Sequence, residues 1–558
     1  MKSKKLLAFA LSMAVAAGCT ACGGGQASTD TSAAGSSDST QAESSATGDN
    51  TVIVAMGSGF STLDPGYVYE KYPQLIVNAC YENLFKFYEN NGTPQPCLAD
   101  TYEFSEDGLT LTVKLKDGLT FASGNKITSA DVAFSINRTK NLKGNPSFIC
   151  DTIESIETPD DATVIFHLNQ PDSAILSKLT YSSLAVLDSA VVKENGGTDA
   201  EDASSTDTAQ SFLDNASAGS GMYILTSYTP DEEVVLEKNP NYWGEAPEVD
   251  SFSIKYIPDN DAKILAMQNG EVDFLSGIKN VSAESYAQME QMDGYGAQVD
   301  EKSLQTYYVG YNLSSEIFGD QVVREAISSA IDKDAVVENI YGGLFDKADT
   351  FFSRDLPYCD VEQTVYGFDL DHANQILDEA GYVDTDGDGI REKNGVKLSA
   401  AFLYQTGTAS DDNMVVYICD QASKIGIELT PQSAQMMDWY AMIQSGDYGL
   451  TIFKTQGGYY DPAMVITNIN PSTSMDPILM QIGASQPELA ALVDELDSAT
   501  DEGRIQEIYN TILTTMADQC LTTPLIYTRQ LAIYSDAVAS YTFPTDASFT
   551  SVQNIHLN

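Results

Sequence analysis

Histidine is nearly absent from this chain, which contains only His167, His372 and His556 among 558 residues. Zinc sites and histidine-based proton transfer therefore have little material to draw on. The six cysteines beyond residue 50 lack the spacing of zinc ligands; they are Cys80, Cys97, Cys150, Cys359, Cys419 and Cys520. There is also no Gly-x-Ser-x-Gly elbow, no His-Glu-x-x-His motif and no Walker loop. We therefore expect no enzyme activity, no resident metal and no cofactor.

Basic residues are also scarce, with 29 Lys and Arg against 80 Asp and Glu, which gives a formal net charge of −51. Nucleic acid is excluded as a partner, because its phosphates need a cationic face. A strongly acidic surface concentrates cationic solutes and also keeps an exported protein soluble. The charge alone does not separate these two interpretations.

Long apolar runs are missing after the first twenty residues. Lys2, Lys4 and Lys5 precede the apolar stretch Leu6–Ala17, which at about a dozen residues is too short to span a bilayer as a helix. This pattern is typical of a signal peptide, which we place at residues 1–22. We therefore expect a protein on the extracytoplasmic face of the cell membrane.

The segment Ala16–Cys19 resembles a bacterial lipobox, in which small residues precede a lipid-modified cysteine. We expect Cys19 to carry the lipid anchor, with Cys22 as the alternative acceptor. An ordinary signal peptide with an unmodified cysteine is the other interpretation. Residues 23–50 consist mostly of Gly, Ser, Thr, Ala, Asp and Gln without apolar periodicity, which predicts a flexible tether. Its root-mean-square reach would be roughly 30 Å.

The roughly 500 residues that follow exceed what one hydrophobic core holds and indicate two or three lobes. Short apolar or alternating segments predict strands at Thr51–Met56, Leu109–Leu119, Val272–Phe274, Gln305–Asn312, Leu398–Tyr404, Ile427–Leu429 and Leu450–Phe453, and a hairpin over Ser155–Leu168. Helices are predicted at Tyr72–Phe87, after a Ser129 N-cap, and at Asp261–Asn269, Val323–Tyr341, Leu370–Ala380 and much of Glu488–Cys520. Strands that alternate with helices indicate an α/β fold.

Several segments, in their order and spacing, resemble the extracytoplasmic solute-binding proteins of bacterial ABC transporters, specifically family 5, the peptide and nickel type. These segments are Ala99–Phe121, Gly219–Leu225 (GSGMYIL), Asn239–Gly244 (NPNYWG), Asn269–Phe274 (NGEVDF), Val323–Lys333 and Glu379–Gly389. The similarity runs from about residue 51 to the C-terminus.

The resemblance implies a two-lobed periplasmic-binding-protein-like fold, of type II and the large cluster C kind, with a hinge and an interlobe cleft. Lobe I would comprise residues 51–305 with the C-terminal 525–558, and lobe II residues 306–524. The hinge crossings would fall near Ser303–Gln305 and Thr522–Leu525. Closure around a ligand would present the protein to an ABC permease and ATPase complex.

The loop Thr455–Pro462 follows a predicted strand, at the end where α/β clefts bind ligands. The resemblance places this loop in the cleft, so Gly458, Tyr459, Tyr460 and Asp461 are candidate ligand-binding residues. Many peptide-binding relatives carry here an Asp that anchors the peptide's amino group, and Gly458 aligns with it. Asp461 is the nearest acid, although it also fits as a cap of the next helix.

Four further candidates follow from position or residue type. Gly57, Ser58 and Tyr72 are expected near the cleft, whereas Trp439 either stacks on ligand or packs a helix. The stretch Ser399–Asp412 contains no Arg or Lys, although some dipeptide-binding relatives place a carboxylate-binding Arg there. This favours a longer peptide, held by backbone hydrogen bonds, or a non-peptide solute.

Asp384–Gly389 resembles the start of an EF-hand loop, but Gly395 stands at the twelfth position, where a bidentate Glu is needed. We therefore expect no metal there. The sequence predicts a lipid-anchored substrate-binding protein of an ABC importer that captures oligopeptides or peptide-like solutes. The alternatives are the same fold with a nickel chelate or an oligosaccharide, and a pheromone-sensing or adhesion lipoprotein.

Overall fold

The computed structural model describes residues 50–558 except 58, 88–92, 173, 278–279, 408, 456–461, 475, 497, 500 and 545–550, and without the side chains of 71, 303 and 304. Asp49–Asn558 form one compact unit, which is the body described below. The predicted signal peptide, tether and lipid acceptors Cys19 and Cys22 lie outside the described residues. Among those described, no helix is both long and apolar enough to cross a membrane.

One mixed sheet runs through the body, in the order β17-β16-β18-β12-β19-β11-β1-β10-β9-β8, with β13 paired to β19. Its strands are β1 (Thr51–Met56), β8 (Tyr223–Thr229), β9 (Glu233–Lys238), β10 (Ser251–Tyr256), β11 (Phe274–Ser276), β12 (Tyr295–Tyr311), β13 (Asp346–Lys347), β16 (Ser399–Gln405), β17 (Glu428–Ala434), β18 (Leu450–Lys454) and β19 (Thr522–Ser535). Strands β1, β10 and β11 are parallel to one another, and so are β16, β17 and β18.

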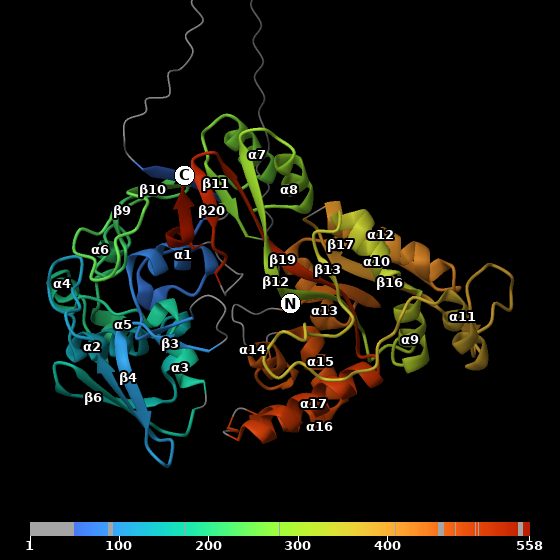
Figure 1. Cartoon of the computed structure of the whole chain (residues 1–558). Helices are drawn as coiled ribbons and strands as arrows, with labels where there is room; N and C mark the ends of the chain where they lie inside the picture. Colours follow the sequence, from blue (N-terminus) through green and yellow to red (C-terminus); the bar gives the residue numbers. More distant parts are fainter. Residues whose placement is uncertain are drawn as a thin grey trace, which may run out of the picture. The chain divides into compact units, whose positions relative to one another are not determined.

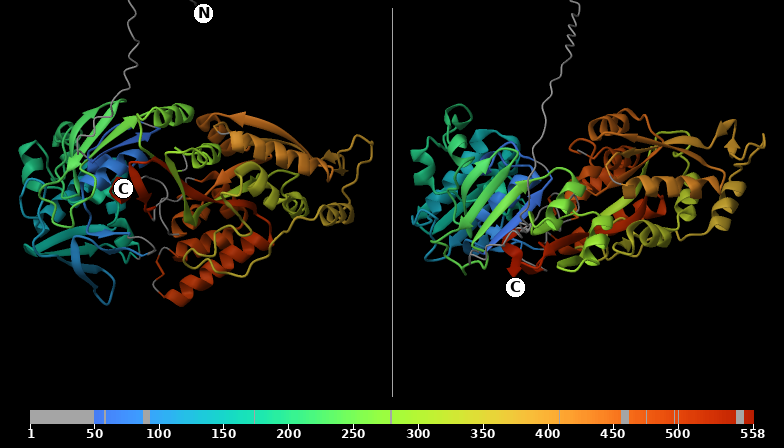
Figure 2. Two further views of the ribbon diagram at one scale, coloured as in Figure 1. Left: turned by 45° about the horizontal axis from the view of Figure 1, so that its top comes forward. Right: turned by 90° about the horizontal axis from the view of Figure 1, so that it is seen from above.

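The two longest strands, β12 and β19, lie side by side in the middle of this sheet and connect its two halves (Figure 1). We call the half with β1 and β8–β11 lobe I and the half with β16–β18 lobe II. The elements drawn blue to green and those drawn orange gather on opposite sides in both views of Figure 2, whereas the red C-terminal strands Val538–Tyr541 and Ile555–Leu557 pack in lobe I. The fold is therefore the predicted two-lobed α/β architecture.

Lobe I also carries an antiparallel four-stranded sheet, in the order β4-β5-β7-β6. Its strands are β4 (Ala99–Phe104), β5 (Thr110–Leu115), β6 (Ile153–Asp160) and β7 (Thr163–Leu168). Leu111, Val113 and Leu115 are buried on one face of β5, which confirms the alternation predicted from the sequence. The hairpin over 155–168 is also confirmed, as β6 and β7.

The helices are α1 (Lys71–Cys80), α2 (Ser129–Leu142), α3 (Ile175–Lys178), α4 (Ser189–Glu194), α5 (Ala203–Thr206), α6 (Gln210–Leu213), α7 (Asn260–Gln268), α8 (Ala283–Glu290), α9 (Gln321–Ala330), α10 (Lys333–Tyr341), α11 (Leu370–Glu379), α12 (Ala409–Ser423), α13 (Met436–Ser445), α14 (Ala463–Ile466), α15 (Pro477–Ser485), α16 (Pro487–Leu496) and α17 (Glu502–Asp518). Short 3₁₀ helices are η1 (Pro65–Tyr67), η2 (Asn145–Cys150), η3 (Ser182–Leu184), η4 (Thr467–Ile469) and η5 (Val552–Asn554). The remaining short strands are β2 (Phe85–Lys86), β3 (Gln95–Pro96), β14 (Glu392–Lys393), β15 (Val396–Lys397), β20 (Val538–Tyr541) and β21 (Ile555–Leu557).

Three predicted helix limits were wrong. The helix predicted to run to Phe87 ends at Cys80, and Phe85 already belongs to β2. The helix predicted from Val323 to Tyr341 is two helices, because Asp332 adopts an extended conformation and caps α10 by accepting a hydrogen bond from the Ala335 amide. Thr128, rather than Ser129, caps α2, through a reciprocal capping box with Asp131.

The two faces of the main sheet are covered differently. On one face a single hydrophobic cluster spans both lobes, from α7 and α8 to α9, α10 and α12, with Leu275 and Tyr307 among the strand residues. On the other face there are two separate clusters, one in lobe I around α1 and one in lobe II around α13 and α15–α17. Side chains alternate accordingly, so that Tyr308 joins the lobe II cluster while its neighbours Tyr307 and Val309 join the shared one. The lobes thus share a continuous core on one face only.

Candidate functional site

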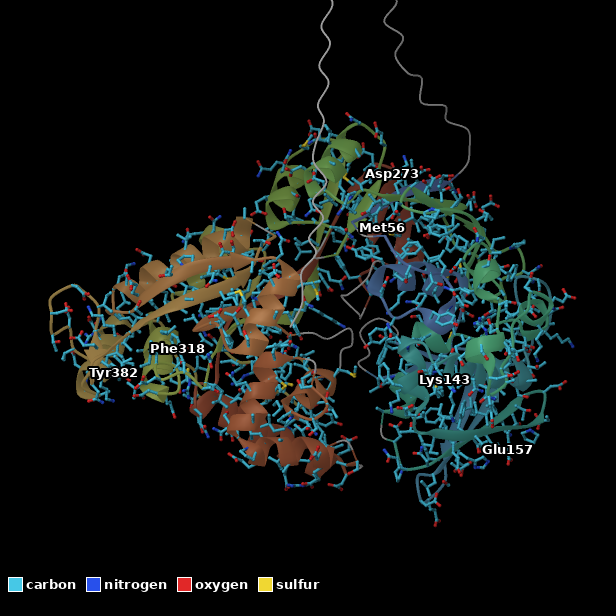
Figure 3. The ribbon with its side chains drawn as sticks, turned by 180° about the vertical axis from the view of Figure 1, so that it is seen from behind. Met56, Lys143, Glu157, Asp273, Phe318 and Tyr382 are labelled. Atoms are coloured by element: carbon cyan, nitrogen blue, oxygen red, sulfur yellow. The ribbon has the colours of Figure 1, made fainter. Side chains whose placement is uncertain are left out.

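The parallel strands of both lobes end towards the same segment of β12 and β19. In lobe II, β18 ends at Lys454 opposite Tyr307, and β16 ends at the same level. In lobe I, β11 ends at Ser276 opposite Ala532, and its parallel neighbour β1 ends level with it at Met56, marked in Figure 3. The loops that follow these strands therefore converge from both sides on the centre of the β12–β19 ladder. Ligands in open α/β sheets bind beyond such strand ends.

That centre of the ladder is irregular and polar. The pairing of β12 with β19 shifts register between Val299 and Ser303 and again between Ser303 and Gln305, opposite Arg529 and Thr528. The residues predicted for the second crossing, Thr522–Leu525, pair within the ladder of lobe II instead. The hinge and lobe boundaries remain a prediction, for which the register shifts give a physical position.

Buried polar side chains cover this segment. Thr306 and Thr455 form a reciprocal pair, in which each backbone amide donates to the other residue at 3.0 Å, one to a hydroxyl and one to a carbonyl. Gln530 donates through Nε2 to Asp300 at 3.3 Å and to the Pro544 carbonyl at 3.0 Å. Burial raises the pKa of Asp300. We call this segment the polar floor; its side chains are buried and hydrogen-bonded to protein partners, and Asp300 is the one acid among those named here.

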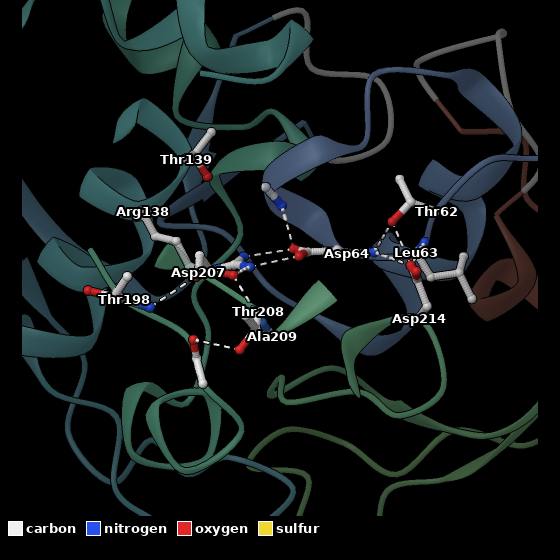
Figure 4. A network of polar contacts seen from close by, with 12 residues as sticks. Thr62, Leu63, Asp64, Arg138, Thr139, Thr198, Asp207, Thr208, Ala209 and Asp214 are labelled. Atoms are coloured by element: carbon white, nitrogen blue, oxygen red, sulfur yellow. Dashed lines mark hydrogen bonds and ion pairs between the residues drawn. The ribbon is translucent and has the colours of Figure 1, made fainter. Parts of the chain in front are cut away.

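The loop after β1 is fixed by a buried ion network (Figure 4). Arg138 of α2 donates two hydrogen bonds of 2.7 Å to Asp64, which also caps η1, and bonds of 2.8 and 2.9 Å to Asp207. The Asp214 carboxylate accepts from the Leu63 amide and the Thr62 hydroxyl. The charged groups of Arg138, Asp64 and Asp207, which form a triad, are almost fully buried. This bidentate geometry holds the loop in one conformation.

A buried lysine lies beneath the start of the same loop. Lys263 of α7 is fully buried and donates to Asn260 at 2.9 Å and Asn280 at 3.0 Å. No carboxylate among the described residues lies within ion-pair distance of it. A side chain at Gly57 would place its Cβ 2.7 Å from the Lys263 Nζ, so any larger residue there would displace the ammonium group. Burial lowers the pKa of Lys263 to about 8.

In lobe II, a groove of about 820 Å³ opens at the ends of β16 and β17. Helix α12 follows β16 into the shared core, whereas α13 follows β17 into the opposite core. The two connections thus leave to opposite faces and open a crevice between the strand ends. The groove is lined by hydroxyl, amide, carboxylate and apolar side chains: Thr406, Ser433, Ala434, Gln435, Asp438, Ala441, Met442 and Ser445.

One hydrogen bond joins the strand-end regions of the two lobes directly. Ser410, in the first turn of α12, donates to the Glu284 carboxylate of α8 at 2.6 Å. Burial acts to raise the pKa of Glu284, but this hydrogen bond lowers it below its ordinary value. The contact lies beside the shared core, at the end of the lobe II strand β16.

The structure describes three of the eight predicted ligand-binding residues. Gly57 directly follows β1, and Tyr72 is half-buried in the first turn of α1 against the lobe I core. Trp439 is buried, stacks on Phe453 with ring centroids 5.1 Å apart and donates to Thr451 at 3.1 Å. This geometry favours the packing role for Trp439. Ser58, Gly458, Tyr459, Tyr460 and Asp461 lie outside the described residues.

Sequence reasoning missed Gln435 and Asp438 because it ended the preceding strand at Leu429. The polar run after Leu429 contains Pro431 and reads as a loop, yet it continues β17 to Ala434. An edge strand tolerates proline, because one side of its backbone needs no partner. The polar residues after Leu429 gave no sign that the strand continues to Ala434.

The acidic loop after α11 brings three carboxylates together, those of Asp384, Asp386 and Asp388. Lys397 forms ion pairs with Asp386 and Asp388, and Asp384 accepts hydrogen bonds from the Gly387 and Gly389 amides. Lys397 thus partly neutralises the negative charge of this loop.

Taken together, two lobes whose strand ends converge on a two-strand connection define a periplasmic-type binding protein. Residues 93–476, more than half of the chain, match the family model described as "Bacterial extracellular solute-binding proteins, family 5 Middle". The chain therefore belongs to the family 5 bacterial extracellular solute-binding proteins.

Among curated relatives, the oligopeptide-binding protein AppA of Bacillus subtilis is 28% identical over 374 residues, which covers 66% of this chain and 66% of the relative. The nickel-binding periplasmic protein of Escherichia coli is 24% identical over 468 residues, covering 84% of this chain and 87% of the relative.

Solved structures show the same fold. NikA from Brucella suis, in complex with Fe(III)-EDTA, gives a TM-score of 0.79 at 24% identity, over 91% of this chain and 100% of that one. AppA from Bacillus subtilis, in complex with a nonapeptide, gives 0.67 at 22% identity, over 91% of this chain and 99% of that one.

Proposed function

We propose that this protein is the lipid-anchored substrate-binding subunit of an ABC importer, and that it captures oligopeptides or peptide-like solutes between its lobes. The observation that carries this proposal is the convergence of strand-end loops from both lobes on the polar centre of β12 and β19. Membership of family 5 and the relative named as oligopeptide-binding support it. We propose no catalytic role.

The described strand-end residues favour recognition through backbone hydrogen bonds over clamping of charged termini. The segment 399–412 contains no Arg or Lys, and Lys263 is enclosed between two Asn side chains. Thr306, Thr455 and Gln530 of the polar floor are neutral. The nearby cations have partners within the protein, since Arg529 pairs with Asp346 and Lys454 lies over the Tyr307 ring. A ligand longer than a dipeptide would gain most from such a surface, because each peptide group adds a donor and an acceptor.

A metal chelate is the second candidate. It is favoured by the relative named as nickel-binding, which aligns over 84% of this chain, and by the structural similarity to a protein crystallised with Fe(III)-EDTA. Three histidines offer little for direct nickel ligation, so the metal would be captured inside an organic chelator.

Native mass spectrometry of the full-length protein, purified from cells grown in rich medium, separates these candidates. Co-purified peptides of mixed sequence, released by mild denaturation, are the expected result. A protein that carries no peptide and gains no thermal stability from peptide pools would contradict the peptide proposal. A bound mass that contains nickel or iron would support the chelate.

The proposed anchor has its own test. Cells fed a radiolabelled fatty acid should label the wild-type protein and Cys22→Ser, but not Cys19→Ser. Loss of label in Cys22→Ser alone would move the anchor to the alternative acceptor. Label in neither the wild type nor the variants would leave an ordinary signal peptide.

A further inference from the structure

Three aromatic side chains form an exposed cluster on lobe I, which we call the aromatic platform: Tyr69, Phe148 and Tyr181. The ring of Tyr69 meets Phe148 edge-on, with centroids 5.8 Å apart and planes at 72°, and stacks on Tyr181 at 6.1 Å and 23°. Tyr69 is 40% exposed and Phe148 is 54% exposed. Single exposed aromatic residues are common on protein surfaces, but three rings in contact make a continuous apolar patch.

The platform is held by rigid supports rather than by its own packing. Tyr69 follows η1, which is capped by Asp64 and thereby tied to Arg138. Phe148 belongs to η2, whose preceding Gly144 lies so close to η1 that a Cβ there would be 2.7 Å from the Tyr67 ring.

Tyr181 is held through its carbonyl, which accepts from Asn83 at 2.7 Å. Helix α2 contacts η1, η2 and η3, so each ring belongs to or adjoins a segment that packs on this one helix. Rings held in advance lose little conformational entropy when a ligand binds.

The position of the platform connects it to the candidate site. Tyr69 lies in the loop between the end of β1 and the start of α1, which is one of the converging strand-end loops. It precedes Tyr72, which the sequence predicted near the cleft, by three residues. The Arg138 network holds Asp64, the cap of η1, against α2, and Tyr69 follows η1 by two residues.

A second exposed pair shows what such rings do elsewhere in lobe I. Tyr102 and Phe104 of β4 also meet edge-on, at 6.2 Å and 86°, and are 42% and 39% exposed. Tyr102 packs on buried Phe85, so this pair covers the four-stranded sheet. It comes from one strand, where alternate residues share a face. The platform instead combines residues from three separate segments. The period of a single strand or helix therefore does not account for their exposure on one patch.

We propose that the aromatic platform is a subsite for an aromatic side chain of the peptide that the protein captures. This inference rests on the proposed function. Stacked and edge-on rings add affinity beyond the apolar area that they bury, by a factor of roughly three to ten for each contact. Phe148 and Tyr69, at 54% and 40% exposure, leave ring surface for such contacts.

The test compares peptides of one length that differ at a single position, with Phe, Ala or Lys, and measures their affinities by titration calorimetry. The wild type should bind the Phe peptides more tightly than the Ala peptides. Phe148→Ala should reduce this preference by about fivefold, and Tyr69→Leu, which keeps apolar volume but removes the ring, should also reduce it. Phe104→Ala is the matched control and should leave the preference unchanged.

Because Phe148 is more than half exposed, its removal should leave the unfolding midpoint close to the wild-type value. Equal preference in Phe148→Ala and wild type would overturn the inference. A preference for Lys peptides that disappears in Phe148→Ala would also overturn it, and would assign the rings to a cation. If the wild type bound no peptide of the set, the proposed function would fail and this subsite with it.

Discussion

Single residues in this protein show how enclosed charge is tolerated near a candidate site. Lys263 is buried with two Asn oxygens as its partners, and burial lowers its pKa to about 8. A lowering of this size corresponds to about 3 kcal/mol between the two protonation states. Gly57 leaves just enough room for the ammonium beneath the end of β1. The lysine thus links α7 to Asn280, in the segment that follows β11, at a cost that depends on pH.

This cost predicts a pH dependence of stability. The folded protein binds the Lys263 proton more weakly than the unfolded chain does, so stability rises with pH as the pH passes from the folded to the unfolded pKa. Between about pH 8 and pH 9.5 the group should add about 1.5 kcal/mol to the free energy of unfolding. Urea unfolding of the wild type and of Lys263→Met should show this rise reduced in the variant. Lys333, whose pKa burial also lowers to about 8, would retain its own share.

Arg138 illustrates the opposite case, a buried charge with two full partners. Burial acts to raise the pKa of Asp207, but the hydrogen bonds and charge of Arg138 lower it below its ordinary value. Arg138→Met would leave Asp64 and Asp207 buried without their cation. We expect a loss of about 3–5 kcal/mol in the free energy of unfolding.

Arg354→Met is the control for this change, because the Arg354 pairs with Asp360 and Glu362 are exposed. Exposed ion pairs contribute little to stability, so the control should unfold almost like the wild type. A similar loss in both variants would show that the enclosure of the triad is not what matters.

At the scale of elements, the sequence predicted what local patterns control. The apolar alternation of β5 and the helix over Leu370–Ala380 were predicted from the sequence, and the structure has both, the helix as α11. The break at Asp332 was missed, because the apolar period continues through Val336 and Val337 while the cap interrupts the backbone. The platform of Tyr69, Phe148 and Tyr181 was also missed, since three distant segments meet only through tertiary packing.

The packing around Gly221 explains why a glycine stands at this position of a recognised motif. It belongs to the GSGMYIL segment, immediately before β8, and a Cβ there would lie 2.4 Å from the Ala79 carbonyl oxygen near the end of α1. Gly221→Ala should therefore force α1 and β8 apart and cost about 1–3 kcal/mol. Thermal unfolding measures this, with Gly367→Ala as the control, because nothing lies within 4 Å of a Cβ there. Equal midpoints for the two variants would contradict the packing argument.

At the scale of the whole body, the division of the cores suggests how the lobes move. A continuous core on one face of the sheet resists separation, whereas the described residues on the other face form two separate cores. The register shifts between Val299 and Gln305 interrupt the ladder of β12 and β19, which connects the lobes. Bending there changes few backbone hydrogen bonds, because the ladder is already irregular. The family resemblance predicted a crossing at Ser303–Gln305, which strand period and composition alone could not, since the irregularity depends on which residues pair.

The last prediction follows from this arrangement. If the lobes close about the irregular segment of β12 and β19, a bound ligand should reduce the radius of gyration measured by small-angle X-ray scattering. The change should saturate at the same ligand concentration as the calorimetric titration, because closure and binding are one equilibrium. Phe148→Ala should require more of a Phe-containing peptide to reach the compact state, yet reach the same final radius, since the residue would contact ligand and not the hinge. Phe104→Ala should follow the wild type at every concentration. A radius that stays constant while calorimetry reports binding would contradict closure and leave a binding protein with fixed lobes.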